Sequence, residues 1–271
     1  MTPVLDFHNH IFPEKVATQV THSLKKERGF TSYGTGTVSG LKEEMKVSGV
    51  KLCLTFAVSV SPSLVESTNT WILSQKGDGL IPIGSIHPLY ENFKPELKRL
   101  KEAGIKGIKF HSLFQNFYPD DEKAFPLYEE ISHQGMFCIF HSGAGLRSKP
   151  EEEVLATPER IGRLLDIFPK ISMVVAHFGG FRMTEEAKKW ILGRNTYIDT
   201  SYPPGLCLQP QDWVLDLIQR HDPDRILFGT DTPFARQKED IEYLLKLPIS
   251  ADLKEKILWK NGRNLLGLSE E

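Results

Sequence analysis

This sequence has few cysteines and no long apolar run, and its positive and negative charges nearly balance. The 271 residues include only three cysteines, widely spaced, which argues against a disulfide framework and is typical of reduced core cysteines in an intracellular protein. No apolar run is long enough to span a bilayer, and the first residues soon turn polar, so we expect neither a membrane span nor a secretory signal. The formal net charge of −2 argues against nucleic acid or an anionic membrane as a partner. We therefore expect a cytoplasmic protein that acts on a small molecule.

The composition is ordinary for a globular protein, with 40% apolar and 25% charged residues. The length suits one large domain or two small ones, and neither a linker nor a low-complexity segment interrupts the chain. We therefore predict a single domain over residues 1–271.

Short apolar segments alternate with helical patterns along the whole chain. Eight of these segments are predicted strands, over residues 4–10, 50–60, 80–87, 105–111, 136–141, 171–177, 196–200 and 225–229. Continuous apolar strands fit a parallel sheet covered by helices, and eight strand–helix units predict an α/β fold, the (β/α)8 TIM barrel. A doubly wound open sheet is the alternative, but no Gly-x-Gly-x-x-Gly motif follows the first strand.

Amphipathic spacing indicates the helices between these strands. Val16, Val20 and Leu24 recur at i, i+4 and i+8 after a proline that can open a helix. Thr157 and Pro158 supply an N-cap and a first-turn proline for a later helix. Further helices are expected over residues 41–48, 63–75, 93–103, 121–133, 184–192 and 210–218, with two more that close the chain.

The first strand contains the sequence DFHNH. Alternate side chains of a strand share one face, so Asp6, His8 and His10 are expected to point together, with Leu5 and Phe7 opposite. Two imidazoles at i and i+2 on a rigid strand can bind one transition metal ion. The alternative is a half-buried strand that happens to contain two histidines. Asp6 is expected either to orient a ligand histidine or to be a satisfied core carboxylate.

Ionisable side chains also end several later strands. His111, His141, His177 and Asp231 follow apolar runs at the carboxyl ends of predicted strands, where TIM-barrel active sites lie. A core residue would more often be apolar at the last three of these positions, which favours a functional role for them. His87 directly precedes a proline and is better explained as a turn residue.

Seven segments carry a resemblance to a known family: LDFHNHIFP, GIKGIKFHSLFQNFYPDD, FCIFHSG, VVAHFGG, YIDTSY, FGTDTPF and NGRNLLGL. In this order, over nearly the whole chain, they resemble the amidohydrolase superfamily. The similarity is greatest to the amidohydrolase-related branch that includes aminocarboxymuconate-semialdehyde decarboxylase. The His-x-His pair alone is unspecific, whereas the ordered set of segments is specific for the family.

The resemblance implies one divalent metal ion, preferably Zn²⁺, bound by His8, His10, His141 and Asp231. It also implies that His177 is a catalytic side chain close to the metal. Other branches bridge a second metal with a carboxylated lysine or a glutamate. No glutamate ends the third or fourth strand here. Lys109 could in principle bridge two metal ions, but the pattern resembles the branch with one metal, so we expect one. The same missing glutamate makes TatD-type nucleases a poorer match.

Two reactions fit this ligand set. In a hydrolase of a small amide, ester or lactone, the metal would lower the pKa of a bound water, Asp231 would take its proton, and His177 would stabilise the oxyanion. In a non-oxidative decarboxylase of a small aromatic or unsaturated carboxylic acid, the metal would bind substrate oxygens and His177 would manage a proton. Hydrolysis is the main hypothesis and decarboxylation the alternative. A barrel that binds a ligand without catalysis is the third.

Candidate substrate-binding residues follow the predicted strands: His111, Arg147 and Tyr202. Arg147 or Arg182 can bind a substrate carboxylate, and Tyr202 or Phe114 can pack against an aromatic ligand. The alternatives are solvated loop arginines and aromatic residues that only seal the barrel. The family resemblance is also compatible with a homodimer.

Overall fold

The structure is a computed structural model that describes residues 2–29, 31–145 and 153–269. Within these residues, neighbouring strands pair in parallel, as predicted. The strands are β1 (Leu5–His10), β2 (Leu52–Phe56), β3 (Leu80–Pro82), β4 (Gly84–Ser85), β5 (Gly107–Phe110), β6 (Phe137–Phe140), β7 (Met173–Val175), β8 (Tyr197–Asp199) and β9 (Ile226–Leu227).

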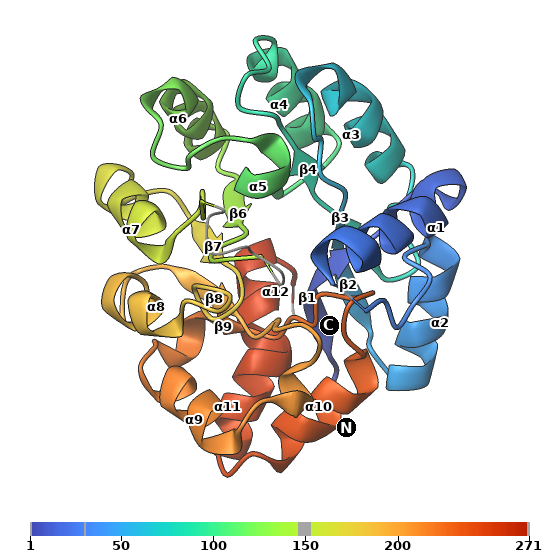
Figure 1. The fold of residues 1–271 in the computed structure, drawn as a ribbon, viewed down its shortest axis with the longest axis vertical. Helices are drawn as coiled ribbons and strands as arrows, with labels where there is room; N and C mark the ends of the chain where they lie inside the picture. Colours follow the sequence, from blue (N-terminus) through green and yellow to red (C-terminus); the bar gives the residue numbers. More distant parts are fainter. Residues whose placement is uncertain (1, 30, 146–152, 270–271) are drawn as a thin grey trace.

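The strands follow one another around a barrel in sequence order (Figure 1). The amide of Phe7 donates to the carbonyl oxygen of Phe228 at 2.8 Å, which joins β1 to the segment after β9 and closes the ring. Only Ile83 separates β3 from β4, and its amide donates to the carbonyl oxygen of Thr55 in β2 at 3.0 Å. β3 and β4 therefore form one interrupted barrel strand. The predicted (β/α)8 barrel is confirmed.

Most helices form a ring outside the strands. They are α1 (Glu14–Ser23), α2 (Val38–Ser48), α3 (Val65–Leu73), α4 (Phe93–Glu102), α5 (Ser112–Gln115), α6 (Phe125–His133), α7 (Pro158–Ile167), α8 (Thr184–Trp190), α9 (Gln211–Gln219), α10 (Gln237–Lys246), α11 (Ala251–Glu255) and α12 (Asn261–Leu266). The hydroxyl of Thr157 accepts a hydrogen bond from the amide of Arg160 and caps α7, as predicted. No helix in the described part of the chain has the length and apolar character needed to cross a bilayer.

Short 3₁₀ and π-helical segments adjoin several of these α-helices. Four are 3₁₀ turns: η2 (Pro62–Leu64), η3 (Glu122–Ala124), η4 (Leu206–Leu208) and η5 (Pro223–Arg225). Two are π-helical: η1 (Leu24–Arg28) and η6 (Lys256–Lys260). The sequence does not predict α5 or α12, because α5 has only four residues and α12 continues from η6 through Asn261 and Gly262, two residues of low helix propensity.

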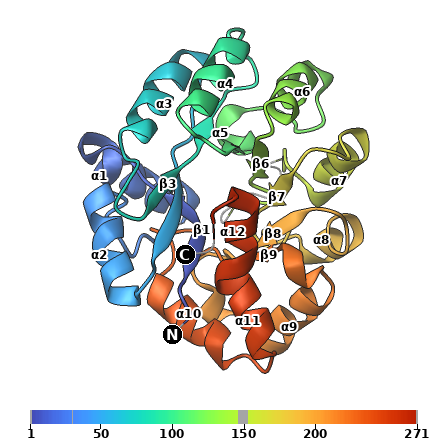
Figure 2. The same cartoon turned by 180° about the vertical axis from the view of Figure 1, so that it is seen from behind.

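Two apolar clusters lie on the two sides of the barrel wall. The larger cluster fills the space between the strands and the surrounding helices. The smaller cluster fills the barrel interior and contains Leu5, Phe7, Leu54, Phe56, Ile83, Phe137, Ile139, Val174, Leu227 and, from α12, Leu266. Figure 2 shows α12 in front of the strands, where it covers one end of the barrel. The polar site lies at the opposite end, where the strands terminate.

The first strand does not alternate regularly. Its register with β2 shifts between Asp6 and Asn9. Phe7 belongs to the cluster inside the barrel, and His8 Nε2 lies 3.3 Å from the Nζ of Lys109. The Asp6 carboxylate instead accepts a hydrogen bond at 2.9 Å from Gln237 of the outer helix α10. The expectation that Asp6 shares a face with His8 is therefore wrong, because the irregularity places Phe7 and His8 on the same side.

Candidate metal and catalytic site

The strand-end side chains meet around one cavity at the carboxyl ends of the strands. The cavity has a volume of about 760 Å³, and five of the predicted residues line it: His10, His111, His141, His177 and Asp231. His8 is fully buried beside them. Because parallel strands bring their carboxyl ends to one edge of the barrel, residues far apart in the sequence are neighbours here.

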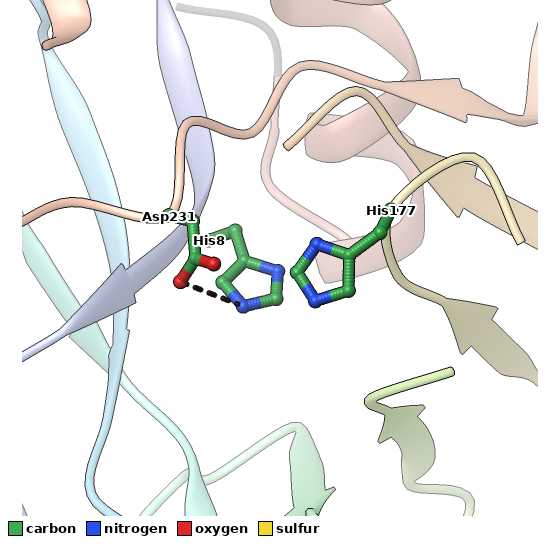
Figure 3. Close-up of side chains that lie close together, drawn as sticks. All are labelled: His8, His177 and Asp231. Carbon is green, nitrogen blue, oxygen red and sulfur yellow. Dashed lines mark ion pairs between the residues drawn. The ribbon is translucent and has the colours of Figure 1, made fainter. Parts of the chain in front are cut away.

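A compact group of three side chains lies at the floor of this cavity. His8, His177 and Asp231 each place one ring nitrogen or carboxylate oxygen within 4.8 Å of the others (Figure 3). His10 Nε2 lies 3.2 Å from Asp231 Oδ1, and His141 Nδ1 lies 2.9 Å from His177 Nε2. All five side chains therefore form one cluster. The compact group includes His177, whereas the ligand set implied by the resemblance contains His10 and His141 in its place.

Hydrogen bonds to acceptor atoms define the tautomers of two of these histidines. His8 Nδ1 lies 2.7 Å from Asp199 Oδ2, and His177 Nδ1 lies 3.1 Å from the carbonyl oxygen of Ser201. A carboxylate and a carbonyl oxygen can only accept, so we assign the ring proton to Nδ1 in both histidines. The lone pair of each Nε2 then faces the cluster, where it can bind a metal ion or a proton.

Asp199, at the end of β8, organises this site, although nothing in the sequence singled it out. Its Oδ1 accepts hydrogen bonds from the amides of His177 at 3.0 Å and Ser201 at 3.1 Å. Burial alone would raise the pKa of Asp199, but the charge of His8 and the hydrogen bond to it outweigh burial and lower that pKa. The available signal was a carboxylate at the end of a short apolar strand, the same signal that indicated Asp231.

Asp231 and His177 have two features that are common at functional positions. Asp231 Oδ1 is buried and makes no hydrogen bond within the described residues, although His10 Nε2 lies 3.2 Å away. The backbone φ is 71° at Asp231 and 61° at His177, a left-handed conformation that costs roughly 1–2 kcal/mol for a non-glycine residue. An unsatisfied oxygen and a strained backbone together favour a ligand-binding role.

Burial lowers the pKa of every histidine at the cluster: His8, His10, His111, His141 and His177. The pKa of His177 falls to about 4. Burial would raise the pKa of Asp231, but the charge of His8 and the nearby ring of His10, whose Nε2 lies 3.2 Å from Asp231 Oδ1, lower it. At neutral pH the cluster therefore consists of neutral imidazoles and an ionised carboxylate, which are the states that divalent metal ions require. The donor set fits such an ion.

Lys109 of β5 adds a buried cationic group. Its Nζ lies 3.3 Å from His8 Nε2 and 4.5 Å from the centre of the Phe56 ring. Burial lowers the pKa of Lys109 to about 8. The contact uses the same lone pair that would bind a metal, so metal binding at His8 requires that Lys109 give up this contact.

His111 lies in the cavity wall, as expected of a substrate-binding residue. Its ring stacks between Phe114 and His141, with ring centroids 4.0 Å and 4.2 Å away. Its buried Nδ1 makes no hydrogen bond within the described residues. The stacking holds the ring rigidly, and Phe114 also lines the cavity.

The other two substrate-binding candidates lie elsewhere. Tyr202 is absent from the described lining of the cavity: its hydroxyl accepts a hydrogen bond from the amide of Arg182 at 3.0 Å, and its ring packs on Trp213. The expected contact between Tyr202 and substrate is therefore not supported, because the chain after β8 directs this ring into the outer core. Arg147 lies outside the described residues.

Asp6 and His87 have structural partners. Asp6 accepts a hydrogen bond from the hydroxyl of Thr230 at 2.6 Å, and burial raises its pKa to about 7. His87 Nδ1 accepts a hydrogen bond from the amide of Leu89 at 3.2 Å within a turn, as predicted. Asp6 is thus a satisfied core carboxylate, and the carboxylate that orients the ring of a candidate ligand is Asp199.

Comparison with protein families gives a match over most of the chain. The family model described as Amidohydrolase matches residues 57–268. A search of curated protein sequences finds no match.

Solved structures resemble the whole chain in fold. An uncharacterized TIM-barrel protein from Bordetella bronchiseptica is 23% identical, with 98% of each chain covered and a TM-score of 0.72. A dihydroxybenzoic acid decarboxylase from a Polaromonas species, solved with manganese and the inhibitor 2-nitroresorcinol, is 16% identical, with 100% of this chain and 98% of its own covered and a TM-score of 0.74. A 5-carboxyvanillate decarboxylase from Novosphingobium aromaticivorans, solved with manganese and 4-hydroxy-3-methoxy-5-nitrobenzoic acid, is 15% identical, with 98% and 96% covered and a TM-score of 0.72.

Proposed function

We propose, given that the chain belongs to the amidohydrolase family, that it is a metal-dependent, non-oxidative decarboxylase of an aromatic or unsaturated carboxylic acid. The observation that carries this proposal is the buried cluster of histidines and Asp231 at the floor of a mostly apolar cavity. Solved structures of the same fold that are named as decarboxylases support it. Decarboxylation, the alternative in the sequence analysis, thus takes precedence over hydrolysis.

One divalent metal ion is proposed at this cluster, held by His8, His10, His141 and Asp231. The metal would bind substrate oxygens and stabilise the negative charge that develops on the substrate as carbon dioxide leaves. Three imidazoles and a carboxylate suit Zn²⁺, the ion expected from the sequence. Two solved structures of similar fold contain manganese, so the metal content has to be measured.

His177 is the residue that we assign to the proton. In decarboxylation the bond between the substrate carbon and its carboxylate breaks, carbon dioxide leaves, and the carbon takes up one proton. His177 Nδ1 lies 3.1 Å from the carbonyl oxygen of Ser201, so Nε2, which also lies 2.9 Å from His141 Nδ1, is the nitrogen that we assign to take up and release that proton. With a pKa of about 4 the ring is neutral at pH 7, so the proton that it passes to the substrate carbon first has to be taken up from water.

The cavity also favours a substrate with an apolar body. Its described lining is mostly apolar side chains and contains no lysine or arginine. A substrate carboxylate is therefore best accommodated at the metal-binding cluster, and the uncharged part of the substrate along the apolar lining.

Hydrolysis of a small amide, ester or lactone is the second candidate. The observation that favours it is the buried Oδ1 of Asp231, which makes no hydrogen bond within the described residues. Such an oxygen can accept the proton of an attacking water. The same residues would then serve a different reaction, so the products decide between the two candidates.

The test is carbon dioxide release from a panel of aromatic and enoic acids, measured with protein loaded with Mn²⁺ or Zn²⁺. A parallel panel of amides, esters and lactones measures hydrolysis. We expect carbon dioxide from at least one acid, and loss of that activity in His177→Asn but not in His133→Asn, which changes an exposed histidine on α6. Turnover only in the hydrolysis panel would replace the proposal with the second candidate. A protein that binds no metal and turns over neither panel would favour the binding-only barrel.

A further inference from the structure

The cavity extends well beyond the polar cluster at its floor. At about 30 Å³ for each water-sized group, its volume of about 760 Å³ holds roughly 25 such groups, whereas benzoate has about nine non-hydrogen atoms. A single-ring acid would therefore leave most of the cavity to water. The unfilled part lies between two walls of apolar side chains.

The first of these walls comes from α1 and the turn η1. The sequence predicts an amphipathic helix with Val16, Val20 and Leu24 on its apolar face, but none of the three is buried in the core, and the buried residue of α1 is Ala17. Figure 1 shows α1, in dark blue, in front of β1 and β2 and not in the ring around the barrel. The three apolar side chains instead line the cavity.

The second wall comes from the segment that follows β2. Val60, Leu64 of η2 and Trp71 of α3 line the same cavity. Val60 is 50% exposed and Leu64 is 43% exposed, so two large apolar side chains border solvent at this entrance. Exposed apolar residues that gather on a cavity indicate a ligand that covers them.

Among the described residues that line the cavity, the ionisable side chains lie at the opposite end. Within its described lining, the ionisable side chains are Asp231 and the cluster histidines, and the polar side chains on the two walls are neutral, such as Gln19 and Thr68. A ligand that fills the cavity therefore meets polar and metal-binding groups at one end and apolar surface along its remaining length.

We propose that the substrate is an amphipathic carboxylic acid, with its carboxyl group at the histidine–aspartate cluster and a second ring or an alkyl chain between α1 and α3. This inference rests on the proposed function for the position of the carboxyl group. Val20 on α1 and Trp71 on α3 are specificity-determining residues, because they contact the part of the substrate that a single-ring acid lacks.

The test compares the binding of benzoate and biphenyl-4-carboxylate to the metal-loaded protein by calorimetry. Both probes have the same carboxyl head, so the difference reports on the second ring. We expect biphenyl-4-carboxylate to bind at least tenfold more tightly. Equal affinities, or no binding of either acid, would overturn the inference.

A matched pair of variants on α1 tests where the second ring lies. Val20→Asp places a charge in the apolar wall and should weaken biphenyl-4-carboxylate binding at least tenfold. Thr18→Asp places the same charge on an exposed position outside the described lining and should leave binding unchanged. Leu64→Asp tests the other wall at a position that is 43% exposed, and it should also weaken biphenyl-4-carboxylate binding. Equal weakening by Val20→Asp and Thr18→Asp would refute the assignment.

The binding measurement separates this inference from the proposed function. Tight, Val20-dependent binding of the larger acid without carbon dioxide release from any acid would support the cavity inference and reject the decarboxylase. Carbon dioxide release from single-ring acids, with no preference for the larger probe, would support the decarboxylase and reject the cavity inference.

Discussion

Asp199 Oδ2 lies 2.7 Å from His8 Nδ1, and both side chains are fully buried. The two residues are 191 positions apart in the sequence. The carboxylate accepts the Nδ1 proton, so it determines which nitrogen of His8 is available to a metal ion and holds the ring in that orientation. Asp199 is therefore a positioning residue: it acts on the site through His8 and through the backbone of His177.

Asp199→Asn should weaken metal binding by about 10- to 100-fold, because the variant loses the charge that orients and polarises His8. Competition with a chelating dye measures this affinity. Asp212→Asn, at an exposed position of α9, is the matched control and should bind metal as the unchanged protein does. Equal affinity in the two variants would show that Asp199 does not support the metal site.

His141→Ala and His177→Ala should have different effects. We expect His141→Ala to lose both metal and activity, and His177→Ala to keep the metal while turnover falls by about 10²- to 10⁴-fold. Metal content and carbon dioxide release, measured on the same preparations, distinguish the two. Loss of metal from His177→Ala would place His177 among the ligands, in keeping with its position in the compact group with His8 and Asp231.

Metal removal should destabilise the protein, because a metal that binds only the folded state adds to its stability. With free metal at 100 times its dissociation constant, the expected contribution is about 2.7 kcal/mol, seen as a fall in Tm after chelation. Elemental analysis should find one ion per chain. Two ions would bring Lys109 into the ligand set, and an unchanged Tm after complete removal would argue against a structural contribution from the metal.

His221 should make stability depend on pH outside the active site. Its Nε2 donates to the carbonyl oxygen of Thr196 at 2.9 Å, and its Nδ1 accepts from the amide of Gly193 at 3.1 Å, so only the neutral ring satisfies both bonds. Burial lowers the pKa of His221 to about 4. The unfolded chain, with a pKa of about 6.5, therefore binds this proton more readily, and the folded state loses stability as the pH falls from about 6.5 to about 4.

The expected loss from His221 is at most about 3 kcal/mol over this pH range. Denaturant unfolding at several pH values measures it. His221→Gln keeps one donor and one acceptor but cannot titrate, so the difference between the two proteins should shrink at low pH. A constant difference from pH 7 to pH 4 would contradict the assignment.

The barrel and most of the strand-end site could be predicted because they depend on local pattern. Apolar segments of strand length, separated by helical spacing, specify the order of the elements, and the barrel rule places His141, His177 and Asp231 at one end. Thr157 and Pro158 start α7 through interactions within a single turn. None of these inferences requires a contact between distant residues.

Features of the site that depend on contacts between residues distant in the sequence became visible only in the tertiary structure. The irregular pairing of β1 with β2 places the Asp6 and His8 side chains on different faces, and alternation along one strand cannot reveal it. The apolar face of α1 has the spacing of a core helix, and only its position in the tertiary structure shows that Val20 lines the cavity. Asp199 and His8 are 191 positions apart in the sequence, and closure of the barrel brings the end of β8 close to His8 in β1.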